Sequence, residues 1–291
     1  MLGWIVYERE GAKHNQKYID WYIEEGKKLD ITIQLICVED LVFGVEDNKQ
    51  YVKHKGKIAK HVNFVICRVI YPLLSFQFET LNIPVFNSST VSSLCNDKSK
   101  TYQYVSTRNV NMVDSVFVRN KELRCYMNQI THPVIIKSVC GHGGQQVCYY
   151  DPKGQHEYKQ QEILSIIQSD DVVVQPMVGT KHEDLRVYVI GNEIVAAVLR
   201  KATRGFRANY SLGGEVSLYE LSAHEREIVQ IILSGYQFDY VGVDFIIGDD
   251  GSLIFNEIED VVGARMLCAC SDINIVEKYL SYIKDKITGL R

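Results

Sequence analysis

Two strand-like runs that carry three carboxylates constrain this chain most: residues 240–260 read YVGVDFIIGDDGSLIFNEIED. The Asp250-Gly251 pair between apolar runs is typical of a two-residue hairpin turn. With that turn Asp244 lies directly opposite Glu257, and with a loop longer by two residues it is diagonal to Glu257 on the same face. Glu259 shares this face because strand side chains alternate with period two. The side chains predicted to point the other way, into a core, are Val241, Val243, Phe245 and Ile247.

This cluster of carboxylates predicts a bound cation or a raised pKa. Two like charges about 4 Å apart repel by about 4 kcal/mol at an effective dielectric constant of about 20. Because all three groups supply hard oxygen ligands, magnesium or manganese is favoured over zinc. The alternative is an acidic hairpin that is exposed to water and holds no ligand.

A glycine-containing loop is the second signal, in the passage PVIIKSVCGHGGQQVCYY at residues 133–150. One strand is predicted to end at Lys137 and the next to resume at Gln146. Glycines let backbone N–H groups wrap phosphate oxygens, but the passage matches neither a Walker A nor a Rossmann pattern. A plain flexible hairpin explains it equally well. Lys137 ends an apolar run, where a charge is costly unless it meets an anion. The loop glycines are Gly141, Gly143 and Gly144.

The first ninety residues alternate strand-like and helix-like segments, which predicts a parallel α/β sheet. The predicted strands are 3–7, 31–38, 62–67 and 83–86, the helices are 13–29 and 72–81, and a small hairpin spans 51–58. The polar run Asn87-Ser88-Ser89-Thr90 is interpreted as a break, and a domain boundary is predicted near Ser88–Ser92.

The rest of the chain mixes helices with long alternating strands. A helix capped by Asn96 or Asp97 is predicted to run toward Thr107. Gly191-Asn192 is typical of a hairpin turn. The strands are predicted at 184–190, 194–200, 240–247 and 252–259, and amphipathic helices at 222–234 and 273–287.

These segments, in this order, resemble ATP-grasp enzymes, and most closely the RimK-type carboxylate–amine ligases, relatives of glutamate ligases and glutathione synthetase. The likeness covers roughly residues 60–270. Its passages are VICR at 65–68, PVFNSS to NDKSKT at 84–101, IIKSVCGHGGQQV at 135–147, VVVQPMV at 172–178, EDLRVYVIGNEIVAAVLRKA at 183–202, FRANYSLGG at 206–214 and the acidic hairpin.

The resemblance implies an α/β (α+β) chain with an ATP-grasp fold preceded by a small Rossmann-like domain. The pre-ATP-grasp domain would span residues 1–90 and the ATP-grasp domain residues 91–291. Within the latter, a lid-like subdomain would span about 100–176 and a metal-binding subdomain about 177–291.

The resemblance also implies roles, residue by residue. Lys98 and Lys137 would contact nucleotide phosphates, with Lys137 also near the adenine. The glycine loop would cover the triphosphate, and Asp184 would bind the ribose region. A hinge would read the adenine edge through Gln175, Met177 and Val178. The phosphate-transfer site would be lined by Arg186, Arg200, Arg207 and Asn209, and two magnesium or manganese ions would be held by Asp244, Glu257 and Glu259.

Two departures from the family pattern put the substrate class in doubt more than the use of ATP. The family usually has Glu-x-Asn where this chain has Glu257-Ile258-Glu259. The hinge has Gln175-Pro176-Met177 where an acidic–aromatic pair is common. Since Pro176 lacks an N–H, Met177 or Val178 must supply the adenine donor.

Plainer interpretations of single residues stay open. Asp184 and Arg186 are same-face neighbours and could form a surface ion pair, worth at most about 1 kcal/mol. Lys98 could belong to a solvated capped helix. The positive run from Arg200 to Arg207 could be a solvated face.

The implied chemistry joins a carboxylate to an amine through an acylphosphate. The substrates would be a small-molecule or peptide carboxylate and an amine. Arg68 or Arg265 is expected to hold a second substrate carboxylate, unless that arginine serves a structural ion pair. The alternatives are a kinase or thioester-forming ATP-grasp enzyme, and a nucleotide-binding protein without catalysis.

Charge and hydropathy exclude several classes. The chain has 32 Lys and Arg against 36 Asp and Glu, a net charge of −4, which argues against nucleic-acid binding by bulk positive charge. No run approaches the roughly 18 apolar residues of a membrane span, and the N-terminus turns acidic before a signal core forms, so a cytoplasmic protein is expected. The eight cysteines form no CxxC pair, and Cys268 and Cys270 are interpreted as ordinary thiols. A homo-oligomer is left open.

Overall fold

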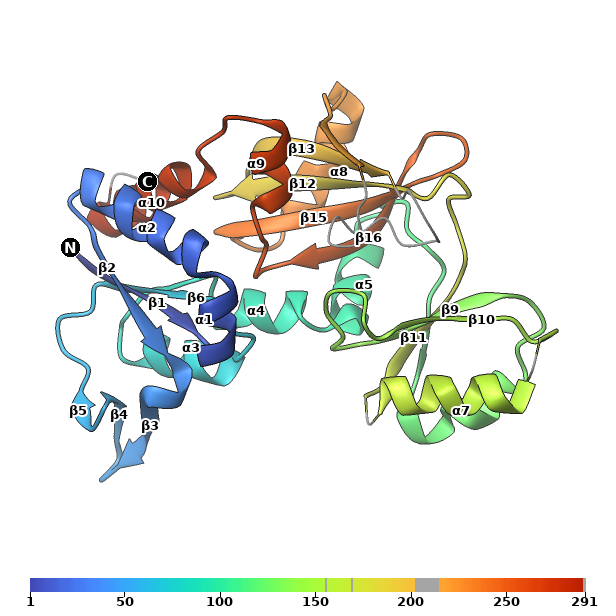
Figure 1. Ribbon diagram of the computed structural model, residues 1–291, viewed down its shortest axis with the longest axis horizontal. Coiled ribbons are helices and arrows are strands. Elements are labelled where there is room, and N and C mark those ends of the chain that lie inside the picture. The colour runs from blue at the N-terminus through green and yellow to red at the C-terminus, as the bar shows by residue number, and fades with distance from the viewer. Residues whose placement is uncertain (155, 169, 202–214, 290–291) are drawn as a thin grey trace.

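A parallel four-stranded sheet forms the N-terminal part of the computed structural model, which describes residues 1–154, 156–168, 170–201 and 215–289 (Figure 1). All of its neighbouring strands are parallel, as the alternating pattern predicts. Their order is β2 (Thr32–Cys37), β1 (Leu2–Tyr7), β6 (Phe64–Cys67) and β7 (Val85–Phe86). The predicted site residues Arg207 and Asn209 lie outside the described residues.

Alternate residues of β1 face two helical layers. Ile5 belongs to a buried cluster with α2 (Gln16–Lys28) and the C-terminal helix α10 (Ile275–Thr288). Trp4 belongs to the cluster under α3 (Pro72–Thr80) on the opposite face. The last helix of the chain therefore packs beside the first sheet.

The helix predicted over residues 13–29 is confirmed as α2 over residues 16–28, but its start is wrong, because two helices meet at Asn15. α1 (Arg9–His14) ends where the Asn15 side-chain amide donates to the Gly11 carbonyl oxygen at 2.8 Å. An asparagine that bonds backbone in this way competes with helix continuation. The corner that results faces the cavity described below.

A small antiparallel sheet lies between β2 and β6 in the chain. It contains β3 (Leu41–Glu46), β4 (Lys49–His54) and β5 (Lys57–Ile58). The predicted hairpin turn is confirmed, with Lys55 and Gly56 both at positive φ. The strand β3 was not predicted.

The polar run that was interpreted as a break begins a helix instead. Ser88 caps α4 (Ser89–Cys95), its hydroxyl accepting from the Val91 N–H. Asp97 caps α5 (Lys98–Ser106), as predicted. The domain boundary near residue 90 stays a prediction.

A second four-stranded sheet is set apart from the rest of the molecule (Figure 1). Its order is β10 (Val147–Tyr150), β9 (Val134–Ser138), β11 (Val172–Pro176) and β8 (Val116–Val118). One apolar cluster joins this sheet to α6 (Leu123–Met127) and α7 (His156–Ile167).

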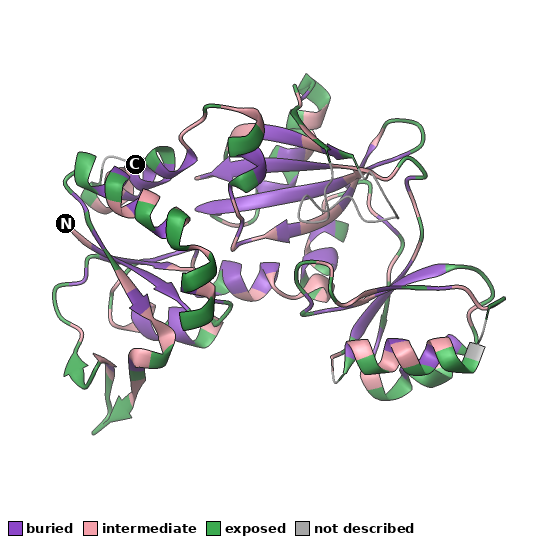
Figure 2. Cartoon of the chain, in the orientation of Figure 1, coloured by how far each residue is buried: buried purple, intermediate pink, exposed green. Residues whose placement is uncertain are grey.

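A five-stranded antiparallel sheet forms the centre, and its buried strands are visible in Figure 2. Helices α8 (Ala223–Leu233) and α9 (Arg265–Cys270) pack on opposite faces of it. The predicted strands and the amphipathic helices are confirmed within about two residues. The strand order is β14 (Glu215–Leu218), β13 (Glu193–Lys201), β12 (Glu183–Ile190), β15 (Tyr240–Ile247) and β16 (Leu253–Glu259).

The buried amide of Asn87 joins the first sheet to the central sheet. Its Nδ2 donates to the Tyr240 carbonyl oxygen at 2.8 Å, and its Oδ1 accepts from the N–H groups of Asp239 and Tyr240. The end of β7 is thereby attached to the start of β15.

None of the helices in the described ranges has the length and hydropathy that a membrane crossing requires. All eight cysteines lie in the described part of the chain, and none forms a disulfide bond.

Candidate functional site

A cavity of about 1340 Å³ lies where the three larger sheets approach one another. Its walls come from the α1–α2 corner, the β9–β10 loop, the connection from β11 to β12, and β16. The predicted residues that line it are Lys98, Lys137, Gly141, Gly143, Gly144, Gln175, Met177, Val178, Asp184, Arg186, Arg200, Glu257, Glu259, Arg68 and Arg265. Asp244 does not line this cavity.

In the acidic hairpin Asp244 lies opposite Glu257, as predicted, but the pairing of the strands that leads to this register differs from the predicted one. At the turn Ile247 pairs with Leu253, so strict pairing would place Asp244 opposite Asn256. A β-bulge at Asn256 adds one residue to β16 and brings Glu257 opposite Asp244.

Beyond the bulge, the side chains of β16 face the opposite side of the sheet from the side that strict alternation would give them. Phe255 and Ile258 lie in the core, whereas Asn256, Glu257 and Glu259 line the cavity. Strict alternation would have put Phe255 and Glu257 on one face. On β15 the predicted inward set is confirmed: Val241, Val243, Phe245 and Ile247 share a buried cluster.

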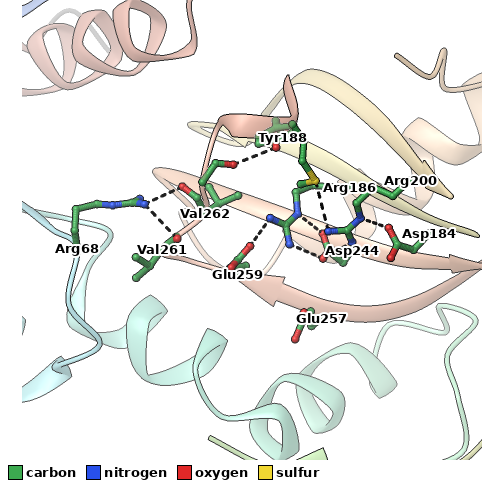
Figure 3. Close-up of polar contacts among 12 residues, drawn as sticks. Arg68, Asp184, Arg186, Tyr188, Arg200, Asp244, Glu257, Glu259, Val261 and Val262 are labelled. Atoms are coloured by element: carbon green, nitrogen blue, oxygen red, sulfur yellow. Dashed lines mark hydrogen bonds and ion pairs between the residues drawn. The ribbon is translucent and has the colours of Figure 1, made fainter. Parts of the chain in front are cut away.

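Two arginines hold Asp244 behind the cavity wall (Figure 3). Arg186 on β12 donates through Nε and Nη2 to both Asp244 oxygens at 2.7 Å. Arg200 on β13 donates through Nη2 to Asp244 Oδ2 at 3.0 Å. Asp244 is only 2% exposed, and burial alone would raise its pKa; the two guanidinium groups outweigh burial and lower that pKa to about 2.

Each arginine also pairs with a carboxylate at the cavity. Arg186 Nη1 lies 2.5 Å from Glu259 Oε2, and Arg200 contacts Asp184. Burial raises the pKa of Asp184 to about 6, although Arg200 lies beside it. The plainer interpretation of Asp184 and Arg186 as a surface ion pair is wrong, because each pairs with another residue and Arg186 is buried.

Lys98 begins α5 and faces the cavity rather than solvent. Its Nζ donates to the Gly141 carbonyl oxygen at 2.5 Å and lies 3.5 Å from Glu257 Oε2. Its side chain is only 12% exposed, so the interpretation as a solvated helix residue is wrong.

Lys137 reaches the cavity from β9. Its Nζ donates to Asn256 Oδ1 at 3.0 Å. Burial lowers the pKa of Lys137 from 10.5 to about 8; Glu257 offsets part of that shift and Lys98 adds to it.

The glycine loop joins β9 to β10 as predicted, since Val147 pairs with Lys137. Gly143 and Gly144 both have positive φ, +63° and +73°, which few other residues adopt. The loop lines the cavity through these glycines, and its backbone has a conformation that glycine adopts more readily than other residues.

The predicted hinge lies where the chain passes from the second sheet into the central sheet. Gln175 is buried at the end of β11, and its Nε2 donates to Ser115 Oγ at 2.9 Å. Met177, 40% exposed, and Val178 follow in the connection to β12.

Glu257 and Glu259 fit a magnesium or manganese ion, because both bring hard carboxylate oxygens to the cavity wall and are about one-third exposed. Figure 3 shows Glu257 apart from the paired arginines. Asp244 has both oxygens bonded to guanidinium groups. Within the described ranges, no three His, Cys, Asp or Glu side chains form a metal-binding group.

The two candidate substrate arginines differ in their contacts. Arg68 Nη2 donates to the carbonyl oxygens of Val261 and Val262 at 3.2 and 3.0 Å (Figure 3). Its guanidinium also lies over the Tyr18 ring, 5.5 Å from the ring centroid. Arg265 is exposed at the cavity and begins α9, next to Met266, whose sulfur is 3.9 Å from Arg200 Nη1.

Asn256 is a polar cavity residue that was not predicted from the sequence. A signal for it exists: apolar Phe255 and acidic Glu257 cannot share a face of one regular strand, which indicates an extra residue between them.

A family model described as the RimK-like ATP-grasp domain matches residues 95–283. The chain is 25% identical to an uncharacterised protein of Mycoplasma genitalium, over 97% of this chain and 95% of that protein. It is 26% identical to a glutamate–LysW ligase of Sulfurisphaera tokodaii, over 94% of this chain and 95% of that one.

The fold is also similar to that of a solved structure, D-alanyl-alanine synthetase A from Vibrio cholerae. The TM-score is 0.72 at 12% identity, covering 99% of this chain and 98% of that chain.

Proposed function

This chain belongs to the RimK-like ATP-grasp family, and we propose that it uses ATP to join a carboxylate to an amine. Family membership confirms the predicted ATP-grasp fold. One observation carries the proposal: among the charged groups that line a single cavity are cations from four different elements and two neighbouring carboxylates of β16. These residues are Lys98, Lys137, Arg186, Arg200, Glu257 and Glu259.

The triphosphate of ATP would lie among the cations, under the glycine loop. Lys98 and Lys137 supply ammonium donors to phosphate oxygens, and the loop backbone supplies N–H groups. The adenine would lie against the hinge, where Met177 or Val178 offers the N–H that Pro176 lacks. Asp184, predicted to bind the ribose region, would exchange its contact with Arg200 for that role.

Glu257 and Glu259 would hold Mg²⁺ or Mn²⁺. The ion would neutralise charge on the phosphate oxygens during transfer. Asp244 would become a metal ligand only if it lost its hydrogen bonds to Arg186 or Arg200. Two ions and three protein ligands stay predictions.

The reaction has two balanced steps. A carboxylate oxygen attacks the γ-phosphorus, the bond from that phosphorus to the ADP oxygen breaks, and an acylphosphate forms. The amine nitrogen then attacks the acyl carbon, the carbon–oxygen bond to phosphate breaks, and the nitrogen loses a proton. Arg186 and Arg200 would stabilise the charge on the transferring group, while the covered cavity keeps water from the acylphosphate.

Raising the pH through about 8 is expected to weaken nucleotide binding. Phosphates favour charged Lys137, whose pKa of about 8 means that it loses its proton above that pH in the free protein. Binding then requires proton uptake, so the Kd for ADP should rise by up to about tenfold per pH unit above 8. The measurement is the Kd for ADP from about pH 7 to about pH 10. Lys137→Arg should flatten this dependence, and a flat wild-type profile would contradict it.

Arg265→Met is expected to raise the substrate KM about tenfold or more and to leave ADP affinity unchanged. We propose Arg265 for a substrate carboxylate because Arg68 already donates to two backbone carbonyl oxygens, whereas Arg265 is exposed at the cavity. A charge-assisted hydrogen bond of about 1.5–3 kcal/mol accounts for the size of the effect. Steady-state kinetics check it, and an unchanged KM would remove Arg265 from the substrate site.

The experiment that tests the function is ADP release from ATP and Mg²⁺ with a panel of carboxylate donors and amines. The relative named a glutamate–LysW ligase puts glutamate and acidic peptides first in the panel. Donor-dependent ADP release with a new amide mass supports a ligase. A stable phosphorylated product without an amine would select the kinase alternative, a thiol-dependent product would select the thioester alternative, and ADP binding without turnover on any donor would oppose the ligase.

A further inference from the structure

Lys137 is a half-buried cation whose hydrogen-bond partner is a neutral group. In the described structure its ammonium donates to one side-chain oxygen, the amide Oδ1 of Asn256 at 3.0 Å. Lys98, in contrast, lies 3.5 Å from the Glu257 carboxylate. An amide oxygen accepts a hydrogen bond without cancelling the positive charge, and an ammonium group has three N–H donors, so two stay available for an anion.

A β-bulge in β16 determines which side chains surround this contact. Without the extra residue in β16, Asn256 would pair opposite Asp244, and Glu257 would face the core beside Phe255. With it, Asn256 and Glu257 both line the cavity. The Asn256 amide therefore faces the cavity in either register, and the bulge adds the Glu257 carboxylate to the same face.

We propose that Asn256 is a positioning residue, whose amide oxygen aims the Lys137 ammonium at the nucleotide phosphates without pairing it with a hydrogen-bonded carboxylate. This inference rests on the proposed nucleotide role of Lys137. A carboxylate at position 256 would pair with Lys137 and repel phosphate, and an apolar side chain would leave the ammonium without an orienting partner.

The test is a double-mutant cycle read by ADP affinity, measured in EDTA and again with Mg²⁺, without any acyl donor. Asn256→Ala is expected to weaken ADP binding by about fivefold to tenfold, and the isosteric Asn256→Asp by more than about tenfold. In a Lys137→Met background, Asn256→Ala should add less than about twofold, since its effect acts through the lysine. Melting temperature is measured for every variant.

Asn111→Ala is the matched control. The Asn111 amide donates at 3.4 Å to the carbonyl oxygen of Leu253, which is on β16 like Asn256, and Asn111 does not line the cavity. ADP affinity should be unchanged in this variant. If Asn256→Ala does not fold, Asn256→Asp, which keeps the size of the side chain, carries the test.

Equal losses from Asn256→Ala in the wild-type and Lys137→Met backgrounds would overturn the proposal, as would wild-type ADP affinity in Asn256→Asp. Normal ADP affinity in Lys137→Met would remove the lysine from the nucleotide site and the inference with it. Failure of the ligase proposal is a different result, namely ADP binding by the wild-type protein without turnover on any donor.

Discussion

Asp244→Ala is expected to lower the free energy of unfolding by about 3–5 kcal/mol, because it leaves two buried guanidinium groups without their shared anion. Asp244 is 2% exposed, and it accepts bidentate hydrogen bonds from Arg186 and a further one from Arg200. Both arginines are less than 10% exposed. Urea denaturation followed by far-UV circular dichroism measures the effect.

Asp249→Ala is the control for that prediction. Asp249 lies in the loop of the same hairpin and accepts from the N–H and hydroxyl of Thr180, but it is exposed. Its removal should cost about 1 kcal/mol or less. A loss below about 1 kcal/mol in Asp244→Ala itself would mean that the arginines find other partners, and the pairing described above would be wrong.

Glu257→Gln is expected to lower kcat/KM for ADP release by about 100-fold or more while the fold is retained. Glutamine keeps the shape of the side chain but loses the charge proposed to hold Mg²⁺, and a loss of about 2.7 kcal/mol in transition-state stabilisation corresponds to a factor of 100. Glu257 is about one-third exposed, and its nearest cation, Lys98, is 3.5 Å away. The melting temperature should therefore change little.

Glu46→Gln provides the matched variant for this change. Glu46 forms an exposed ion pair with Lys53, also at 3.5 Å, on the small sheet outside the cavity. Turnover in this variant should equal wild type. ADP affinity measured in EDTA should not fall in Glu257→Gln, because without a metal ion nothing bridges residue 257 and the ADP phosphates. A loss of ADP affinity in EDTA as large as the loss with Mg²⁺ would contradict the metal role of Glu257.

Local pattern accounts for most of the central sheet. Alternation along β15 predicts which residues enter the core beside α8, although the residues of the opposite face, Asp244 among them, are buried as well. For β16, a two-residue turn at Asp250-Gly251 predicts Glu257 as the partner of Asp244, and that partner is correct although the turn is not. The real loop is longer, which shifts the pairing by one residue, and the bulge at Asn256 shifts it back. A bulge depends on the register of the whole hairpin, which short-range pattern does not determine.

The arginine pairs could not be predicted from spacing. Arg186, Arg200 and Asp244 lie on three strands, and their contacts depend on β12 pairing with both β13 and β15. Arg68 and Arg265 are equivalent candidates in the sequence, and only tertiary structure places one on the carbonyl oxygens that follow β16. Likewise, the polar run at Ser88 is typical of a break between elements, and only the structure shows that the Ser88 hydroxyl caps a helix.

Oxygen transfer from substrate to phosphate tests the central claim most directly. Each carboxylate donor in the panel is labelled with ¹⁸O in its carboxyl group, and the inorganic phosphate released with ATP, Mg²⁺ and amines is analysed by mass spectrometry. Attack of the carboxylate on the γ-phosphorus predicts one ¹⁸O atom in each phosphate formed together with amide. Amide formation with unlabelled phosphate, or phosphate released without any donor, would contradict carboxylate activation by phosphoryl transfer in this cavity.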